Sequence, residues 1–287
     1  MLKTGGSAEH AQTAQRFFKE EIRSYGWRTG DLRRAVVHKR REILKQSDLK
    51  FLLQVADNLF NGDINEDKNA AVFLLEDLTD KFGDPEFSLL KSWLPRISNW
   101  SDHDALVHYL IGPMIATKPA RAKNVFRWAK SPDRWHRRAA CVALIQGTRQ
   151  KMFFPEIVRL SIQLLHDPDD MVQKGLGWLL RETAKADPKR TVQHLRRIRG
   201  NAPRLVLRTA CETLHPSTRR AILRDLSSPA AALPCCHTHL AIPANLRHNK
   251  SLSLLCRRLP EQGNNCVDDS SGAQGCAQTT ALSCSRN

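Results

Sequence analysis

The sequence predicts an all-α protein built from repeated helix pairs, and three observations support this class. Residues 1–228 show almost no alternation of polar and apolar residues, which would indicate strands. Helical patterns follow one another instead, for example FLLQVADNLF at 51–60 and EIVRLSIQLLH at 156–166. Short segments that contain Pro and Asp, such as HDPDD and KADPK, separate them and are typical of turns.

One helical segment recurs at a nearly constant interval. KNAAVFLLEDL, RAACVALI and RTACETL each begin with a cation and continue into small and then bulky apolar residues, and DALVHYLIG and KGLGWLLRE fall between them. The five segments begin at residues 68, 104, 138, 174 and 208, at intervals of 36, 34, 36 and 34 residues. A period near 35 residues indicates stacked helix pairs, and the W-x₂-L-G-x₂-Y pattern of TPR repeats is missing. We therefore expect a HEAT-like α-solenoid.

The repeat predicts which side chains share a surface. In a solenoid the second helix of each pair lines one concave face, so residues near the five starting points should lie in adjacent rows. The residues placed there are Trp100, Asp104, Arg138, Lys174, Trp178 and Arg208. The sequence thus predicts a groove with cations, two tryptophans and one carboxylate.

The charge favours a polyanionic partner. The chain of 287 residues has a formal net charge of +16, more than solubility requires, and nucleic acid is the simplest such partner. Five basic and three acidic residues give the segment 229–287 a charge of +2, which leaves +14 for residues 1–228. No apolar run approaches the roughly 18 residues that would span a bilayer, and the N-terminus lacks the apolar core of a secretory signal.

Residues 229–287 differ in composition from the rest. They contain no Phe, Trp or Tyr and six of the eight cysteines. We expect a disordered tail after a domain at 1–228, because so little apolar area cannot offset the entropy of ordering. A disulfide framework or a zinc site stays open as an alternative, although no C-x₂-C pair is present. Two cysteines in the domain and no signal peptide favour the cytoplasm.

Asp104 and Arg138 each allow two interpretations. SDHD at 101–104 fits a capping box, with Ser101 as N-cap and Asp104 at N3, and His103 would then be a surface residue. Arg138 falls on a largely apolar helix face and needs a partner, since an unpaired buried charge is costly. If the repeat is correct, Asp104 is the acid in the adjacent row, and Arg138 would hold it ionised and oriented.

Trp178 lies on the polar side of its helix. Val172, Leu176, Leu179 and Leu180 form the stripe that should face the core, whereas Trp178 aligns with Lys174, Arg181 and Lys185. A tryptophan that covers a neighbouring repeat is one interpretation. A flat or cationic ligand is the other, and a methylated purine base in DNA is both. We interpret Trp93, Trp128 and Trp135 as packing residues.

Motifs of several enzyme classes are missing. GxxxxGK[ST], HExxH, GxSxG and paired CxxC do not occur, so NTPases, zinc proteases and serine hydrolases are disfavoured. We expect neither a metal nor a cofactor.

Three motifs resemble the AlkD-like DNA alkylation-repair family, which consists of HEAT-repeat DNA glycosylases. They are NWSDHDALVHYLIGP at 99–113, RWHRRAACVALI at 134–145 and MVQKGLGWLLRETAKADP at 171–188. The resemblance spans roughly residues 12–225 and includes the N-terminal stretch FFKEEIRSYGWRTGDLRRAV. By motif, it implies that Asp104 is the catalytic aspartate and that Trp100, Arg138 and Trp178 complete the catalytic set.

The resemblance also implies an activity. The family hydrolyses the N-glycosidic bond of positively charged N3- and N7-alkylated purines in double-stranded DNA, and it leaves the base in the duplex. Lys174, Arg181, Lys185 and Arg208 would then bind phosphates. We expect a cytoplasmic, metal-free DNA glycosylase of base excision repair that works as a monomer and binds DNA at the nucleoid. The alternatives are a catalytically silent HEAT scaffold that binds nucleic acid and a protein-binding HEAT adaptor.

Overall fold

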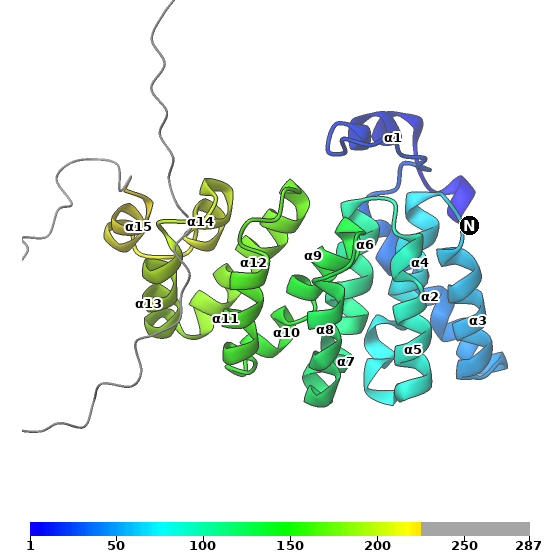
Figure 1. Cartoon of the computed structure of the whole chain (residues 1–287). Coiled ribbons are helices and arrows are strands. Elements are labelled where there is room, and N and C mark those ends of the chain that lie inside the picture. The colour runs from blue at the N-terminus through cyan, green and yellow to red at the C-terminus, as the bar shows by residue number, and fades with distance from the viewer. Residues whose placement is uncertain (225–287) are drawn as a thin grey trace, which may run out of the picture. The chain divides into compact units, whose positions relative to one another are not determined.

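The computed structural model describes residues 1–224, and every regular element in this range is a helix (Figure 1). The pairing of Arg23 with Ile64 is an isolated β-bridge between two loops. The all-α class is therefore confirmed. The expected tail at 229–287, with its cysteines, lies outside the described residues.

The helices follow one another along the whole of residues 1–224. The first part of the chain contains η1 (Leu2–Thr4), α1 (Ala8–Gln15), α2 (Thr29–Gln46), α3 (Leu49–Phe60), α4 (Asn65–Leu75), η2 (Glu76–Lys81), α5 (Asp84–Ser92) and η3 (Leu94–Arg96). The middle part contains α6 (Trp100–Leu106), η4 (Val107–Ile111), α7 (Gly112–Thr117), η5 (Pro119–Ala122), α8 (Lys123–Trp128), α9 (Arg134–Val142) and α10 (Ile145–Thr148). The last part contains α11 (Phe154–Gln163), α12 (Asp170–Ala186), α13 (Pro188–Ile198), α14 (Arg204–Ala210) and α15 (Pro216–Leu223).

Five of these helices carry the recurring segments, and we call them the repeat helices: α4, α6, α9, α12 and α14. Each repeat helix packs against the next one along the chain. In Figure 1 they follow one another across the molecule from the blue to the yellow end. Other helices, among them α3, α8 and α11, pack against the repeat helix that follows. Side chains about 35 residues apart are thereby brought into contact.

The longest repeat helix, α12, shows how local sequence produces this packing. Asp169 caps its N-terminus, because the Asp169 carboxylate accepts hydrogen bonds from the amides of Met171 and Val172. The predicted apolar stripe is confirmed, since its members Val172, Leu176, Leu179 and Leu180 are buried. A Cβ at Gly177 would lie only 2.6 Å from Cβ of Thr209, so glycine allows α14 to approach α12 closely.

The helix that begins at Trp100 changes its winding after two turns. α6 continues into η4, a π-helical turn, and then into α7 without a break. Pro113 provides a local reason, because proline has no N–H to donate to the carbonyl four residues earlier and its ring clashes with that carbonyl. The wider turn carries His108 and Tyr109, and π-turns of this kind are frequent at functional sites.

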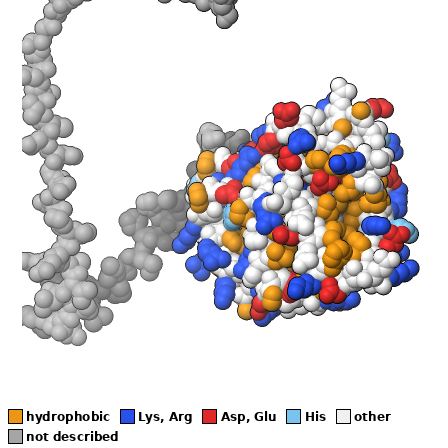
Figure 2. Space-filling view, turned by 90° about the vertical axis from the view of Figure 1, so that its right-hand side faces the viewer, with side chains coloured by type: hydrophobic (Ala, Val, Ile, Leu, Met, Phe, Trp, Pro, Cys, Tyr) orange, Lys and Arg blue, Asp and Glu red, His pale blue; other side chains and the backbone are white. Residues whose placement is uncertain are grey.

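The exterior mixes both signs of charge with apolar side chains. Figure 2 shows the face of the molecule at the right-hand side of Figure 1, where hydrophobic side chains gather between basic and acidic ones. Two exposed large hydrophobic residues, Leu44 and Phe51, belong to α2 and α3. No helix within residues 1–224 is long and apolar enough to cross a membrane.

A buried ion pair joins the first two repeat helices. The Lys68 ammonium on α4 lies 3.1 Å from a carboxylate oxygen of Asp102 on α6, and both side chains are at most 4 % exposed. The same ammonium donates to the hydroxyl of Ser98 and to the carbonyl of Arg96. Removal of one partner leaves the other as a buried, uncompensated charge.

We predict that Lys68→Met lowers the free energy of unfolding by about 3–5 kcal/mol, because Asp102 loses its counter-charge. Urea denaturation at pH 7 measures this change. Lys68→Met combined with Asp102→Leu should recover part of the loss, since the double variant buries no charge. A single variant as stable as the wild type would show that the pair does not hold α4 against α6.

Candidate active site

Asp104 and Arg138 form a bidentate ion pair between α6 and α9. Nε of Arg138 donates to Oδ1 of Asp104 at 3.0 Å, and Nη2 donates to Oδ2 at 2.9 Å. The ion pair expected from the 34-residue offset is therefore present. The interaction is planar and charge-assisted, which fixes the orientation of the carboxylate as well as its position.

Arg138 has a third acceptor that ties the pair to α12. Its Nη1 donates to the carbonyl of Met171 at 2.6 Å, and the residue is 6 % exposed. A Cβ at Gly175 would lie 3.0 Å from Cγ of Arg138, so the glycine provides the space that the arginine occupies. The side chain thus connects three consecutive repeat helices, and its charge is largely shielded from bulk water.

The environment of Asp104 keeps its carboxyl ionised. Burial raises the pKa of Asp104, but the Arg138 charge and the hydrogen bonds from His103 and Arg138 oppose this effect and hold the pKa at about 2. The side chain remains 23 % exposed. Asp104 is thus a carboxylate at neutral pH, held on one side and accessible on the other.

Two expectations for this turn were wrong. Asn99, rather than Ser101, caps α6, because Oδ1 of Asn99 accepts from the amides of Ser101 and Asp102. Asp104 therefore serves no capping box. His103 is fully buried rather than a surface residue, and its Nδ1 lies 2.7 Å from Oδ1 of Asp104. Trp135 of α9 packs beside its ring, with centroids 5.7 Å apart.

A pocket of about 300 Å³ opens beside the Asp104 carboxylate. Trp100, Asp104 and Trp178 all line it, so the structure brings together three of the four residues expected to be catalytic. Arg138, the fourth, does not line the pocket itself but contacts Asp104, which does. The lining also includes Trp27 before α2, Arg33 on α2, Asn69 on α4 and Tyr109 on η4.

The two tryptophans of the pocket are held in different ways. The Trp100 indole donates from Nε1 to the carbonyl of Phe17 at 3.1 Å, and its ring stacks on Phe18 with centroids 5.0 Å apart. The Trp178 ring packs on His108, with centroids 5.2 Å apart. Both tryptophans are half-buried, so each is fixed by the protein and still borders the pocket.

The predicted row of cations is mostly paired with acids of the protein itself. Lys174 lies 3.0 Å from Asp170, Lys185 lies 2.8 Å from Glu182, and Arg181 contacts both Glu182 and Glu212. Arg208 differs, because it is exposed and has no ion-pair partner within residues 1–224. Of the four expected phosphate-binding residues, Arg208 thus has the side chain most accessible to an anion.

The sequence patterns missed several residues of the pocket. His108 lies one turn after Asp104, and burial, as the largest cause, lowers the pKa of its imidazole. The Arg33 guanidinium lies against the rings of Phe73 and Tyr109. Trp27 and Arg33 lie in the stretch SYGWRTGDLRR. Its mixture of aromatic and basic residues is the sequence feature that could have indicated a part of the pocket.

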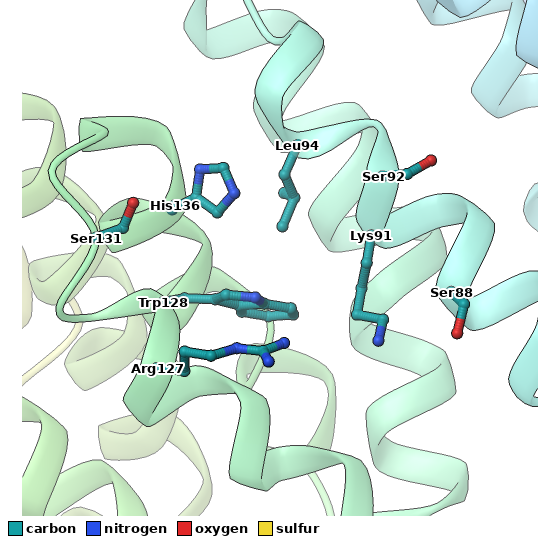
Figure 3. A pocket seen from close by; sticks show the side chains of 8 residues that line it. All are labelled: Ser88, Lys91, Ser92, Leu94, Arg127, Trp128, Ser131 and His136. Carbon is teal, nitrogen blue, oxygen red and sulfur yellow. The ribbon is translucent and has the colours of Figure 1, made fainter.

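A second pocket, of about 500 Å³, lies between α5, η3, α8 and α9 (Figure 3). Figure 3 shows Arg127 alongside the Trp128 ring, with Lys91 facing them. None of the expected site residues lines this pocket. Trp93, Trp128 and Trp135 are at most 5 % exposed, which confirms them as packing residues. Within residues 1–224 no three His, Cys, Asp or Glu side chains are grouped so as to hold a metal ion.

The described residues form an all-helical stack with a pocket beside the Asp104 carboxylate. Comparison with known proteins then identifies the family. The family model described as "DNA alkylation repair enzyme" matches residues 1–214. This chain therefore belongs to the DNA alkylation repair enzyme family, as the sequence motifs predicted.

A solved structure shares the fold. A predicted DNA alkylation repair enzyme from Enterococcus faecalis superposes with a TM-score of 0.67 at 18% sequence identity, over 75% of this chain and 100% of that one. The smu.31 protein of Streptococcus mutans UA159 gives a TM-score of 0.48 at 19% identity, over 64% of this chain and 100% of that one. No curated protein is similar enough to the chain to count as a match.

We predict that Asp104 titrates at about pH 2 and that Arg138→Met raises its pKa. The pKa of the folded state lies below the ordinary value of 3.8, so the stabilisation is complete above about pH 4 and is lost as the pH falls through about 2. Carbon-13 NMR of the Asp104 carboxyl follows the titration. Lys174→Met is the control and should leave this pKa unchanged, because Lys174 pairs with Asp170 instead.

Proposed function

We propose that this protein is a DNA N-glycosylase that hydrolyses the N-glycosidic bond of positively charged N3- and N7-alkylated purines in duplex DNA. The observation that carries the proposal is the Asp104 carboxylate, which is ionised, oriented by Arg138 and exposed to a pocket between Trp100 and Trp178. Membership in the DNA alkylation repair enzyme family supports enzymatic DNA repair as the broader activity.

The proposed mechanism follows from the charge of the lesion. An N-alkylated purine carries a positive charge, so it leaves as a neutral base and needs no protonation. The barrier then lies in the positive charge that develops on the deoxyribose as the C–N bond breaks. A carboxylate that is already in place stabilises this oxocarbenium-like sugar without reorganising, and it can orient the attacking water.

The aromatic side chains would position the nucleotide. Trp100 and Trp178 border the same pocket as Asp104, so a deoxyribose held between them would lie next to the carboxylate. Both rings are fixed by contacts within the protein, which lowers the entropic cost of binding. We propose that the damaged base stays in the duplex while the sugar and its phosphates contact the protein.

A non-catalytic nucleic-acid scaffold is the alternative. A scaffold would need accessible cations along the repeat helices and would have no use for an oriented carboxylate. Three of the four expected cations are instead paired with Asp or Glu, whereas Arg138 is committed to Asp104. These pairings favour the enzyme over a surface that binds by charge alone.

We predict that Asp104→Asn slows release of 7-methylguanine from methylated duplex DNA by at least about 100-fold, because an amide does not stabilise the developing cation. Single-turnover assays, in which the released base is separated from the DNA and quantified, measure the rate. Asp84→Asn is the matched control: Asp84 also pairs with an arginine, Arg121, but lies outside the pocket.

Two outcomes would contradict the proposal. A wild-type protein that binds methylated DNA tightly and releases no base would favour the scaffold. A folded Asp104→Asn variant with full activity would remove Asp104 from the mechanism while leaving the activity itself intact.

We predict that Arg208→Gln reduces the slope of log affinity against log salt by about 1, since it removes one phosphate contact. Fluorescence anisotropy with a DNA duplex at several salt concentrations measures the slope. Arg127→Gln is the control, because Arg127 is also exposed but belongs to α8 and borders the pocket of Figure 3. Equal slopes for the two variants would place DNA elsewhere on the molecule.

A further inference from the structure

His103 is a buried histidine whose ring hydrogen-bonds to the proposed catalytic carboxylate. The side chain has no exposed surface, and Nδ1 lies 2.7 Å from Oδ1 of Asp104. The other ring nitrogen, Nε2, is buried and has no hydrogen-bond partner within the described residues. Such a group is costly to bury, so its retention requires a physical reason.

The geometry determines which ring nitrogen carries the proton. At 2.7 Å from a carboxylate oxygen, Nδ1 must be the donor, because a lone pair there would face the lone pairs of Oδ1. Nε2 is then a bare acceptor in the neutral ring. A proton on Nε2 would create a buried cation beside the Arg138 guanidinium, and burial lowers the pKa of His103 accordingly.

The donors around Asp104 are distributed unequally over its two oxygens. Oδ1 accepts from Nε of Arg138 and from Nδ1 of His103, so both of its lone-pair directions are used. Oδ2 accepts from Nη2 of Arg138 as its one partner within residues 1–224. One lone pair of Oδ2 therefore remains for a ligand, and Asp104 borders the pocket.

We propose that His103 is a positioning residue that saturates Oδ1 of Asp104 and thereby assigns Oδ2 as the oxygen that faces the reacting sugar and water. Without the imidazole, the carboxylate would have free lone pairs on both oxygens. It would also lose one of the hydrogen bonds that restrain rotation about its Cβ–Cγ bond. This inference rests on the proposed glycosylase activity and adds a residue and an atom to it.

The test removes the donor and then restores it. His103→Leu keeps a buried apolar side chain but has no donor, and it should slow single-turnover release of 7-methylguanine about tenfold, the typical effect of one hydrogen bond to a charged group. DNA affinity should change by less than about twofold, because His103 touches no ligand. His103→Asn places an amide N–H where Nδ1 stands and should restore the rate to within about threefold of the wild type.

A double-mutant cycle separates positioning from packing. If His103 acts through Asp104, His103→Leu should cause no further loss in an Asp104→Asn background. His194→Leu is the matched control: His194 is also buried and bonds to the Ser161 hydroxyl at 2.7 Å, but it lies outside the pocket. That variant should lose stability in thermal unfolding and keep its rate per folded molecule.

Several results would overturn the inference. They are an unchanged rate in His103→Leu, equal losses in His103→Leu and His103→Asn, and an undiminished effect of His103→Leu in the Asp104→Asn background. If His103→Leu does not fold, the comparison of His103→Asn with the wild type decides, and a rate reduced by tenfold or more contradicts the proposal.

A measurement without turnover keeps this inference distinguishable from the proposed function. Nitrogen-15 NMR of histidine-labelled protein at pH 7 should show His103 protonated at Nδ1 and bare at Nε2. A proton on Nε2 alone would overturn the inference even in an active enzyme. A wild type that releases no base would instead overturn the glycosylase proposal, whatever the tautomer of His103.

Discussion

The site depends on one constraint, namely that the buried Arg138 cation has to be satisfied by groups from its neighbouring repeats. It obtains two carboxylate oxygens from α6 and one carbonyl from α12, and Gly175 leaves room for its stem. Desolvation makes such a pair a poor source of stability compared with apolar packing. Its presence is better explained by what it does to Asp104, which stays ionised in a site where burial alone would favour the protonated form.

The N-terminal segment adds a second constraint, because it crosses the beginnings of four repeat helices. Glu66 of α4 accepts from backbone amides of this segment, including those of Tyr25 and Trp27. Earlier in the same segment, Lys19 pairs with Asp170 of α12 and Glu20 pairs with Arg134 of α9. Trp100 of α6 donates to the same segment. One wall of the pocket is therefore fixed by residues that precede the repeats, and a truncated chain would lose the orientation of Trp100.

Sequence periodicity predicted the fold class and the Asp104–Arg138 pair because both follow from one quantity, the repeat length. An offset of 34 residues places two side chains on adjacent helices whatever else surrounds them. The fate of His103 depends on a different quantity, the identity of its neighbour across the helix interface. Its ring is covered by Trp135 from the next repeat, and no spacing within SDHD indicates this. Within the cation row, only the contact of Arg181 with Glu212 has the same cause, since Glu212 lies in the turn after α14. Lys174 and Lys185 pair with acids three or four residues away on α12 itself, a spacing that the helix pattern already contained.

The charges of the pocket limit the reaction that the proposed enzyme could perform. A glycosylase that acts on neutral bases must donate a proton to the departing base. Asp104 remains ionised, and burial lowers the pKa of His108, so its imidazole is disfavoured as a cationic proton donor. Arg33 and Arg138 do not deprotonate. These groups of the pocket therefore favour, for the proposed chemistry, lesions that already carry a positive charge. On this view, selectivity arises from the leaving group itself: an undamaged purine in the same position would face a carboxylate that stabilises the sugar cation but does not protonate the departing base.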